Sequence, residues 1–212
     1  MRFFSNQLTR KESQDLLMRE TLRKSGVEME FVYLDETGKE RQGGKGEVRL
    51  YETVLVIIPE RGDIFRIPYS DISDFSQREY SVIFNTEFGE KLIVSKMGYD
   101  FDPFLKTLSD INNELQLKVL FSLKELIPGA SPTSLMRVAR FMKGGKAARR
   151  VDIETVDPDL WLELEKKVGA AGIKDSYDFL KGMSQEKRIC IGLKRGLMGD
   201  LTGEYIWFLI PI

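Results

Sequence analysis

The chain has 212 residues, of which 42% are hydrophobic and 31% are charged, so it can bury a core without disulfides or structural metals. It has no histidine and one cysteine, Cys190. This composition excludes Ser–His–Asp and Cys–His catalysis, zinc sites of the usual Cys/His type and internal disulfides. The net charge of −1 gives no overall signal for nucleic acid or membranes.

The charge is distributed unevenly along the chain. Residues 1–115 contain 16 Lys and Arg against 21 Asp and Glu, a difference of −5, whereas residues 116–212 contain 16 against 12, a difference of +4. This asymmetry indicates two units with different surfaces. The first ten residues lack the apolar core of a secretory signal, and no apolar run approaches the ~20 residues of a spanning helix. We therefore expect a cytoplasmic protein that reaches a membrane only peripherally.

The N-terminal region carries the signals of a short helix. Thr9 and Glu12 match a capping box, leucines follow, and Gly26 stands where a left-handed residue would end a helix. The sequence predicts a helix over residues 9–25 that packs on the next unit.

Short apolar runs separated by turn signals follow the predicted helix. Residues 27–33 alternate apolar and acidic side chains, which is typical of a strand with one solvated face. Residues 53–58 are nearly all apolar, so this strand is expected to be buried on both faces. The remaining predicted strands are residues 48–51, 64–67, 72–75, 79–86 and 91–96. Seven strands with short links predict an antiparallel sandwich or small barrel.

A helix is expected to close this series. Asp102 supplies an N-cap acceptor and Pro103 the first helical residue, and apolar side chains then recur at helical spacing as far as Leu115. Residues 117–126 either continue this helix or start another one.

Seven antiparallel strands closed by an amphipathic helix resemble the pleckstrin-homology-like (PH-like) superfold, which includes GRAM and bacterial PH-like domains. The segments that carry the resemblance, within residues 27–115, are Gly46–Leu50, Val54–Pro59, Ile67–Ile72, Phe88–Glu90 and Phe101–Leu108. The resemblance implies a non-enzymatic binding module. Fold alone does not fix function.

Classical PH-like domains hold inositol phosphates with clustered cations in the first hairpin. Here Lys39, Arg41 and Lys45 are candidates, but Glu36 and Glu40 are interleaved with them. The family's basic pattern is not reproduced, so a protein partner or a general lipid surface fits better than a specific phosphoinositide.

The second half matches no pattern that we can name. Helices are predicted from Pro132 to Phe141, from Pro158 to Val168 and over residues 176–183, followed by strands over 188–194 and 204–212. The predicted fold class is α+β: a PH-like sandwich or barrel with its C-terminal helix, then a small mixed unit. The predicted domains are residues 1–26 (helix), 27–127 (PH-like) and 128–212 (helices with a C-terminal β-hairpin).

A basic run without acidic residues lies in the second half. Next to the Gly144-Gly145 break, these cations could bind an anion such as a lipid headgroup, a nucleic acid or a phosphoprotein, or they could be a solvated face and linker. Nucleic acid is disfavoured because only Phe141 is nearby to stack on bases. The candidate anion-binding residues are Arg137, Arg140, Lys143, Lys146, Arg149 and Arg150.

The sequence favours a non-enzymatic adaptor that binds a protein or an anionic membrane surface, without a cofactor. A phosphate-ligand or nucleic-acid binder using the basic run is the alternative. A carboxylate-held metal enzyme ranks last, because its acidic pairs, Asp71 with Asp74 and Asp157 with Asp159, stand at turn or cap positions. The apolar C-terminal run 205–212 predicts either a strand buried within the chain or a surface for self-association.

Overall fold

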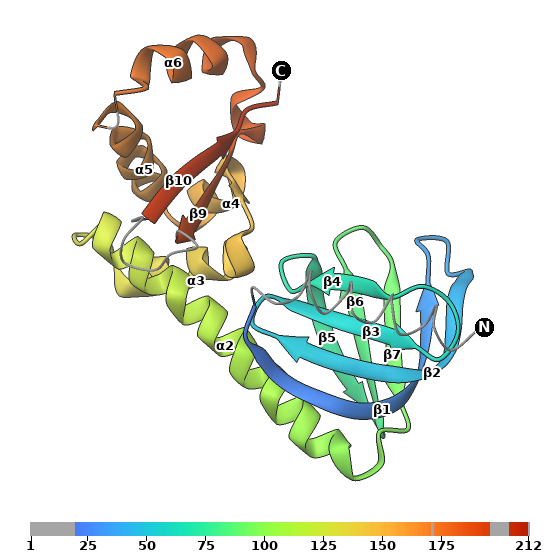
Figure 1. The fold of residues 1–212 in the computed structure, drawn as a ribbon. Helices are drawn as coiled ribbons and strands as arrows, with labels where there is room; N and C mark the ends of the chain where they lie inside the picture. The colour runs from blue at the N-terminus through green and yellow to red at the C-terminus, as the bar shows by residue number, and fades with distance from the viewer. Residues whose placement is uncertain (1–19, 171, 196–203, 212) are drawn as a thin grey trace. The chain divides into compact units, whose positions relative to one another are not determined.

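The computed structural model describes residues 20–170, 172–195 and 204–211. The chain divides into two compact units, Met1–Asn112 and Asn113–Ile212, and the division falls within one helix (Figure 1). The sequence placed a boundary after residue 127, just past the end of that helix at Leu126. The fold class is confirmed: a seven-stranded antiparallel sheet is followed by a helix and a small three-stranded sheet.

Unit 1 is built on the seven-stranded sheet, whose strands lie in the order β4-β3-β2-β1-β7-β6-β5. The strand β1 joins the two halves of the sheet, because it pairs with β2 along its length and with β7 over residues 30–34. The strands are β1 (Leu22–Leu34), β2 (Glu40–Tyr51), β3 (Val54–Pro59), β4 (Phe65–Pro68), β5 (Ile72–Arg78), β6 (Ser81–Thr86) and β7 (Lys91–Ser95).

The predicted helix over residues 9–25 is wrong at its C-terminal end, where residues 22–25 belong to β1. Glu20 and Thr21 are not helical either, and the rest of that predicted helix, residues 9–19, lies outside the described residues. Gly26 does have a positive φ of 72°, as predicted, but the cause differs. The pairing of β1 with β2 shifts register between Lys24 and Val27, so Gly26 serves a bulge in a strand and does not end a helix.

The second strand is much longer than predicted, because it begins at Glu40 and includes three glycines. One of them, Gly46, faces β3 so closely that a Cβ atom there would lie 2.6 Å from the carbonyl oxygen of Ile58. A glycine is therefore required by the approach of two strands, and the strand was predicted to begin only at residue 48 because glycine adds nothing to the hydrophobic pattern.

The core of unit 1 follows the predicted alternation. In β1 the apolar residues Val27 and Phe31 are buried, and in β3 all residues from Val54 to Ile58 are buried, which confirms burial on both faces. The helix α2 (Phe101–Leu126), preceded by the short helix η1 (Gly98–Asp100), adds Phe104, Leu108 and Ile111 to the buried residues. Residues 117–126 continue α2 without a break.

Unit 2 contains a three-stranded antiparallel sheet in the order β10-β9-β8. The predicted helices near 132–141, 158–168 and 176–183 and the two C-terminal strands are confirmed, whereas β8 and α4 were not anticipated. The elements are α3 (Pro132–Phe141), η2 (Lys143–Gly145), β8 (Ala148–Arg149), α4 (Arg150–Val156), α5 (Pro158–Ala170), α6 (Lys174–Met183), η3 (Glu186–Arg188), β9 (Cys190–Arg195) and β10 (Glu204–Leu209).

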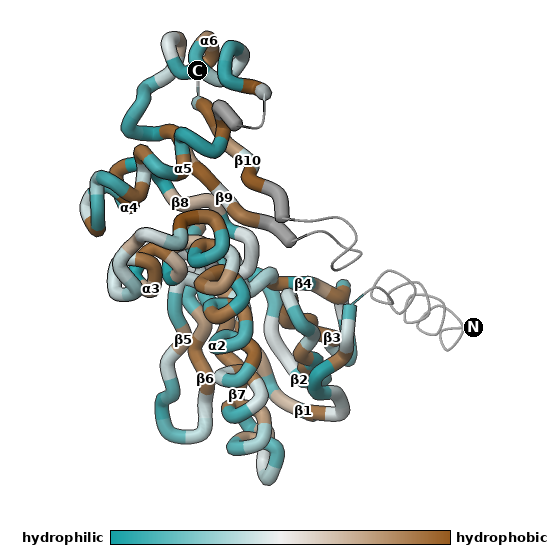
Figure 2. The backbone as a smooth tube through the Cα atoms, turned by 90° about the vertical axis from the view of Figure 1, so that its left-hand side faces the viewer, coloured by the Kyte–Doolittle hydropathy of each residue, from teal (hydrophilic) through white to brown (hydrophobic). Residues whose placement is uncertain are grey.

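A second core fills unit 2. It includes Leu123 from α2, Val138 from α3, Trp161 from α5 and Ile191 from β9, all with exposed fractions near zero. The strands β9 and β10 are largely hydrophobic, whereas α2 alternates hydrophobic and hydrophilic residues along its turns (Figure 2). From β10, Ile206 and Phe208 pack against this core, so the C-terminal strand is buried at least in part within its own chain.

The helices that the structure describes are too short or too polar for any of them to cross a bilayer.

Candidate functional site

The basic run divides into two environments. Arg137 and Arg140 lie on the exposed face of α3, opposite the buried Leu135 and Val138. The helix α3 contains no acidic residue. Its exposed face also carries two apolar side chains, Met136 at 47% exposure and Phe141 at 39%. We call Met136, Arg137, Arg140 and Phe141 together the α3 surface. It places two cations between two exposed apolar side chains.

The arginines at the end of the run are engaged in ion pairs. The guanidinium of Arg149 donates two hydrogen bonds to Asp152, at 2.8 and 3.1 Å. Arg150 donates to Glu154 at 2.6 Å and to Glu186 at 2.8 Å, and its guanidinium carbon lies 5.6 Å from the centre of the Trp161 ring. Although burial lowers it, the pKa of Arg150 is raised by these carboxylates. Both arginines therefore stabilise α4, and Arg150 also joins it to η3.

Lys143 and Lys146 stand between these two environments. The backbone at Lys143 belongs to η2, and Gly144 and Gly145 follow it with positive φ values of 66° and 83°. Lys146 is half-buried and already has a partner within the protein. The described side chains of the run that remain exposed without an ion pair are thus those of Arg137 and Arg140.

The first hairpin of unit 1 does not form a cluster of free cations. Arg41 donates to Glu90 at 2.8 Å and to Glu36 at 3.2 Å, so two carboxylates compensate one guanidinium. The backbone N–H of Lys39 donates to Asp35 at 2.9 Å, and hydrogen bonds from Thr37 and Lys39 hold the pKa of Asp35 below its usual value. The two carboxylates therefore reduce the attraction of Arg41 for a phosphate.

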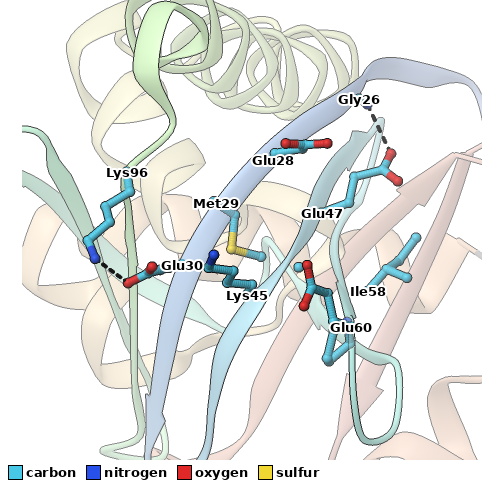
Figure 3. Close-up of a pocket in the computed structure, with 11 residues that line it drawn as sticks. Gly26, Glu28, Met29, Glu30, Lys45, Glu47, Ile58, Glu60 and Lys96 are labelled. Atoms are coloured by element: carbon cyan, nitrogen blue, oxygen red, sulfur yellow. Dashed lines mark hydrogen bonds and ion pairs between the residues drawn. The ribbon is translucent and has the colours of Figure 1, made fainter.

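Lys45 lies farther along β2, in a cavity of about 460 Å³ over β1, β2 and β3 (Figure 3). Lys96 forms an ion pair with Glu30 at 2.6 Å, and Glu47 accepts the backbone N–H of Gly26 at 2.9 Å. The cavity has two lysines but four glutamates, namely Glu28, Glu30, Glu47 and Glu60. Its negative balance disfavours an anion at Lys45.

Two hydrogen-bonded tyrosines have shifted pKa values. Burial and a hydrogen bond to Glu90 raise the pKa of Tyr33 to about 12. In unit 2, burial and the carboxylate of Glu165 raise the pKa of Tyr177, whose hydroxyl donates to Glu165 at 2.7 Å. Lys181 donates to the same carboxylate at 2.8 Å. This group joins α5 to α6, so its polar atoms hold the fold together.

The acidic pairs do not form a metal site in the parts of the chain that the structure describes, since no group of three or more potential metal ligands is found there. Asp157 acts in a turn, where its side chain accepts the backbone N–H of Asp159 at 3.1 Å.

A group of exposed aromatic residues in unit 1 was not predicted from the sequence. Tyr80 occupies the β5–β6 turn and Tyr99 lies in η1, and both side chains are strongly exposed. A tyrosine at a two-residue turn, where Gly, Asn or Asp is usual, is the signal that could have revealed them.

Comparisons with known proteins are distant. No family model matches the chain, and no curated protein matches it. One similar solved structure is the C-terminal domain of an unknown protein from Leishmania infantum, with 15% identity and a TM-score of 0.36 over 48% of this chain and 92% of that one. Another is the N-terminal PH domain of the human ARAP2 protein, with 18% identity and a TM-score of 0.31 over 42% and 76%. These similarities assign no family to the chain.

Proposed function

We propose that this protein is a non-enzymatic binding module that docks on an anionic membrane surface through the α3 surface. The observation that carries the proposal is the exposed face of α3, where Arg137 and Arg140 are flanked by Met136 and Phe141 and no acidic residue is present. Cations attract anionic headgroups, and adjacent apolar side chains enter the headgroup–acyl boundary. The α3 surface offers both.

The size of the expected effect follows from the charges. Each cation near an anionic bilayer contributes about 1 kcal/mol, so Arg137 and Arg140 together contribute about 2 kcal/mol, or roughly thirtyfold in affinity. This contribution fades with salt because it is electrostatic. The expected membrane binding is thus weak and does not select one anionic lipid. Such binding suits a peripheral module whose attachment a second contact strengthens.

Other features support a binding role over catalysis. The polar groups with perturbed pKa values, such as Glu165 and Arg150, are held in ion pairs between elements. The strand order and closing helix of unit 1 fit the resemblance of the sequence to PH-like domains, which serve as binding modules.

A phosphate-containing ligand is the second candidate. It is favoured by the two positive-φ glycines that follow Lys143, because successive backbone N–H groups in such a turn converge on an anion. A soluble phosphate ligand would need Lys143 and this turn, whereas a membrane would depend mainly on the exposed face of α3.

Co-sedimentation with vesicles tests the proposal. Wild type should bind vesicles of phosphatidylcholine with phosphatidylserine at low salt and dissociate at high salt, and the variant Arg137→Glu/Arg140→Glu should lose binding. The matched control is Lys187→Glu/Arg188→Glu, which makes the same change in charge at exposed residues of η3. Equal loss in both variants, or no binding by wild type, would refute docking through α3. Competition by inorganic phosphate or a single-stranded oligonucleotide would instead favour the second candidate.

A further inference from the structure

A groove of about 530 Å³ lies in unit 1 where the β5–β6 turn meets the junction of β7 with α2. Its floor is formed by two apolar side chains, Met97 and Phe101, which are almost completely buried. Its sides are aromatic: Tyr80 has 78% of its surface exposed, and Tyr99 is fully exposed. Exposed tyrosines around an apolar floor are typical of protein interfaces.

Tyr80, the tyrosine of the turn, has an aromatic contact within unit 1. The Tyr80 ring and the buried Phe101 ring meet edge to face, with 5.9 Å between centroids and 67° between planes. One side of the Tyr80 ring is thereby anchored, while most of its surface stays accessible. A tyrosine side chain has few rotatable bonds and loses little conformational entropy on binding, which makes it an efficient contact.

The backbone beside the groove is strained. Among the described residues, the non-glycine positions with positive φ are Glu79, at 50°, and Lys96, at 58°. Glu79 precedes Tyr80 in the turn, and Lys96 lines the groove itself. Each such residue costs about 1–2 kcal/mol that a glycine would avoid. Both strained positions therefore adjoin one groove, as is common where a surface is shaped for binding.

The charges around the groove favour a cation. Lys96 is compensated by Glu30, and Asp100 by Lys24 at 3.0 Å. The carboxylates of Asp102, which lines the groove, and of Glu79 are exposed and have no ion-pair partner among the described residues. Asp102 stands in the first turn of α2, where it also offsets the positive end of the helix dipole. The groove thus combines aromatic rings with unpaired negative charge.

From this combination we propose that the groove binds an arginine-containing segment of a protein partner. A guanidinium stacks on tyrosine faces by cation–π attraction, and its planar fork pairs with a carboxylate such as Asp102. The apolar floor accommodates the aliphatic stem of the arginine. This site uses unit 1 and is independent of the α3 surface, so the protein would connect a basic partner with an anionic surface.

Fluorescence anisotropy with the full-length protein tests this site. The probe is a labelled peptide of alternating Arg and Gly, and the control peptide has Gln in place of each Arg. Wild type should bind the Arg peptide and not the Gln peptide. Tyr80→Ala/Tyr99→Ala should weaken binding about tenfold, because two cation–π contacts are lost. Asp102→Asn should weaken binding and reduce its dependence on salt.

The controls separate this site from general electrostatics and from α3. Phe88→Ala removes an exposed aromatic ring elsewhere in unit 1 and should leave peptide affinity unchanged. Arg137→Glu/Arg140→Glu should also retain peptide binding, so failure on vesicles and failure on peptides remain distinguishable. The proposal is overturned if the Gln peptide binds as tightly as the Arg peptide, or if the tyrosine variant binds the Arg peptide as wild type does. It is also overturned if the Arg peptide does not bind and the tyrosines are instead needed for binding to phosphatidylcholine vesicles.

Discussion

Placing a methyl group at Gly192 should destabilise unit 2. Gly192 of β9 pairs with Trp207 of β10, and the indole covers the glycine. A Cβ atom at residue 192 would lie 2.3 Å from Cε2 of Trp207, 2.5 Å from Cζ2 and 2.6 Å from Nε1. Non-bonded carbons attract each other at about 3.5–4.0 Å. The ring must therefore retreat by more than about 1 Å or leave its site.

The expected loss for Gly192→Ala is about 2 kcal/mol, within the range for one added group in a packed site. Urea unfolding measures it well, because both tryptophans of the chain, Trp161 and Trp207, lie in unit 2 and report its unfolding by fluorescence. A loss of about 2 kcal/mol lowers the midpoint by about 1 M urea.

The matched control is Gly182→Ala in α6, where an added Cβ meets no atom within 4 Å. In a helix this change should stabilise the protein by about 0.5–1 kcal/mol, so the same substitution has opposite signs at two sites. In a Trp207→Leu background, Gly192→Ala should lose most of its effect. If Gly192→Ala unfolds at the same urea concentration as wild type, the indole does not cover Gly192 and the reasoning is wrong.

Three further outcomes are expected. Phe104→Ala leaves a cavity under α2 and should cost about 3–5 kcal/mol, measured by urea unfolding followed by circular dichroism. Glu165→Gln should cost about 2 kcal/mol near pH 7. Hydrogen bonds from Lys181 and Tyr177 hold the pKa of Glu165 below its usual value despite burial, so its stabilisation is complete above pH 4.5 and disappears as the pH falls through the lowered pKa. Melting wild type and variant across that range should show the difference shrinking, and a constant difference would contradict this cause. Arg41→Gln removes the ion pairs of an exposed guanidinium with Glu36 and Glu90 and should cost at most about 1 kcal/mol by the same urea assay.

Most strands of unit 1 were predictable because they carry a local signal, which the glycine-rich first half of β2 lacks. In β1 and β6 apolar and polar residues alternate, and turn residues separate neighbouring strands. The strand periodicity and most strand boundaries can therefore be predicted from residues near each other in the sequence. The start of β1 was not predictable in this way. Leucines before Gly26 satisfy a helical pattern as well as a strand, and only the pairing of Leu22 with Tyr51 decides between them.

The missed elements of unit 2 have the same kind of cause. The helix α4 is rich in β-branched residues and lacks a side-chain N-cap, so its sequence carries little helical signal. The strand β8 has two residues and exists because Ala148 and Arg149 pair with β9.

The residues of the candidate site could be predicted from the sequence, but which of them are engaged in ion pairs could not. The run of cations is visible in the sequence. One hydrogen-bond partner of Arg150, Glu186, lies 36 residues away along the chain. Local patterns supply the number of charges, and only the fold shows which of them are already paired. Arg149 and Arg150 also have carboxylates three and four residues further along the chain, Asp152 and Glu154, whereas α3 contains no acidic residue beside Arg137 and Arg140.

The helix α2 belongs to both units, so hydrogen exchange along it can compare their stabilities. Its 26 residues form one rod of about 39 Å, and its buried side chains belong to unit 1 as far as Ile111 and to unit 2 from Val119 onward. The amides near Leu108 should therefore be protected from exchange with solvent deuterium to the extent set by the stability of unit 1, and those near Leu123 to the extent set by unit 2. The step in protection along this single helix measures the difference in stability between the units without cutting the chain.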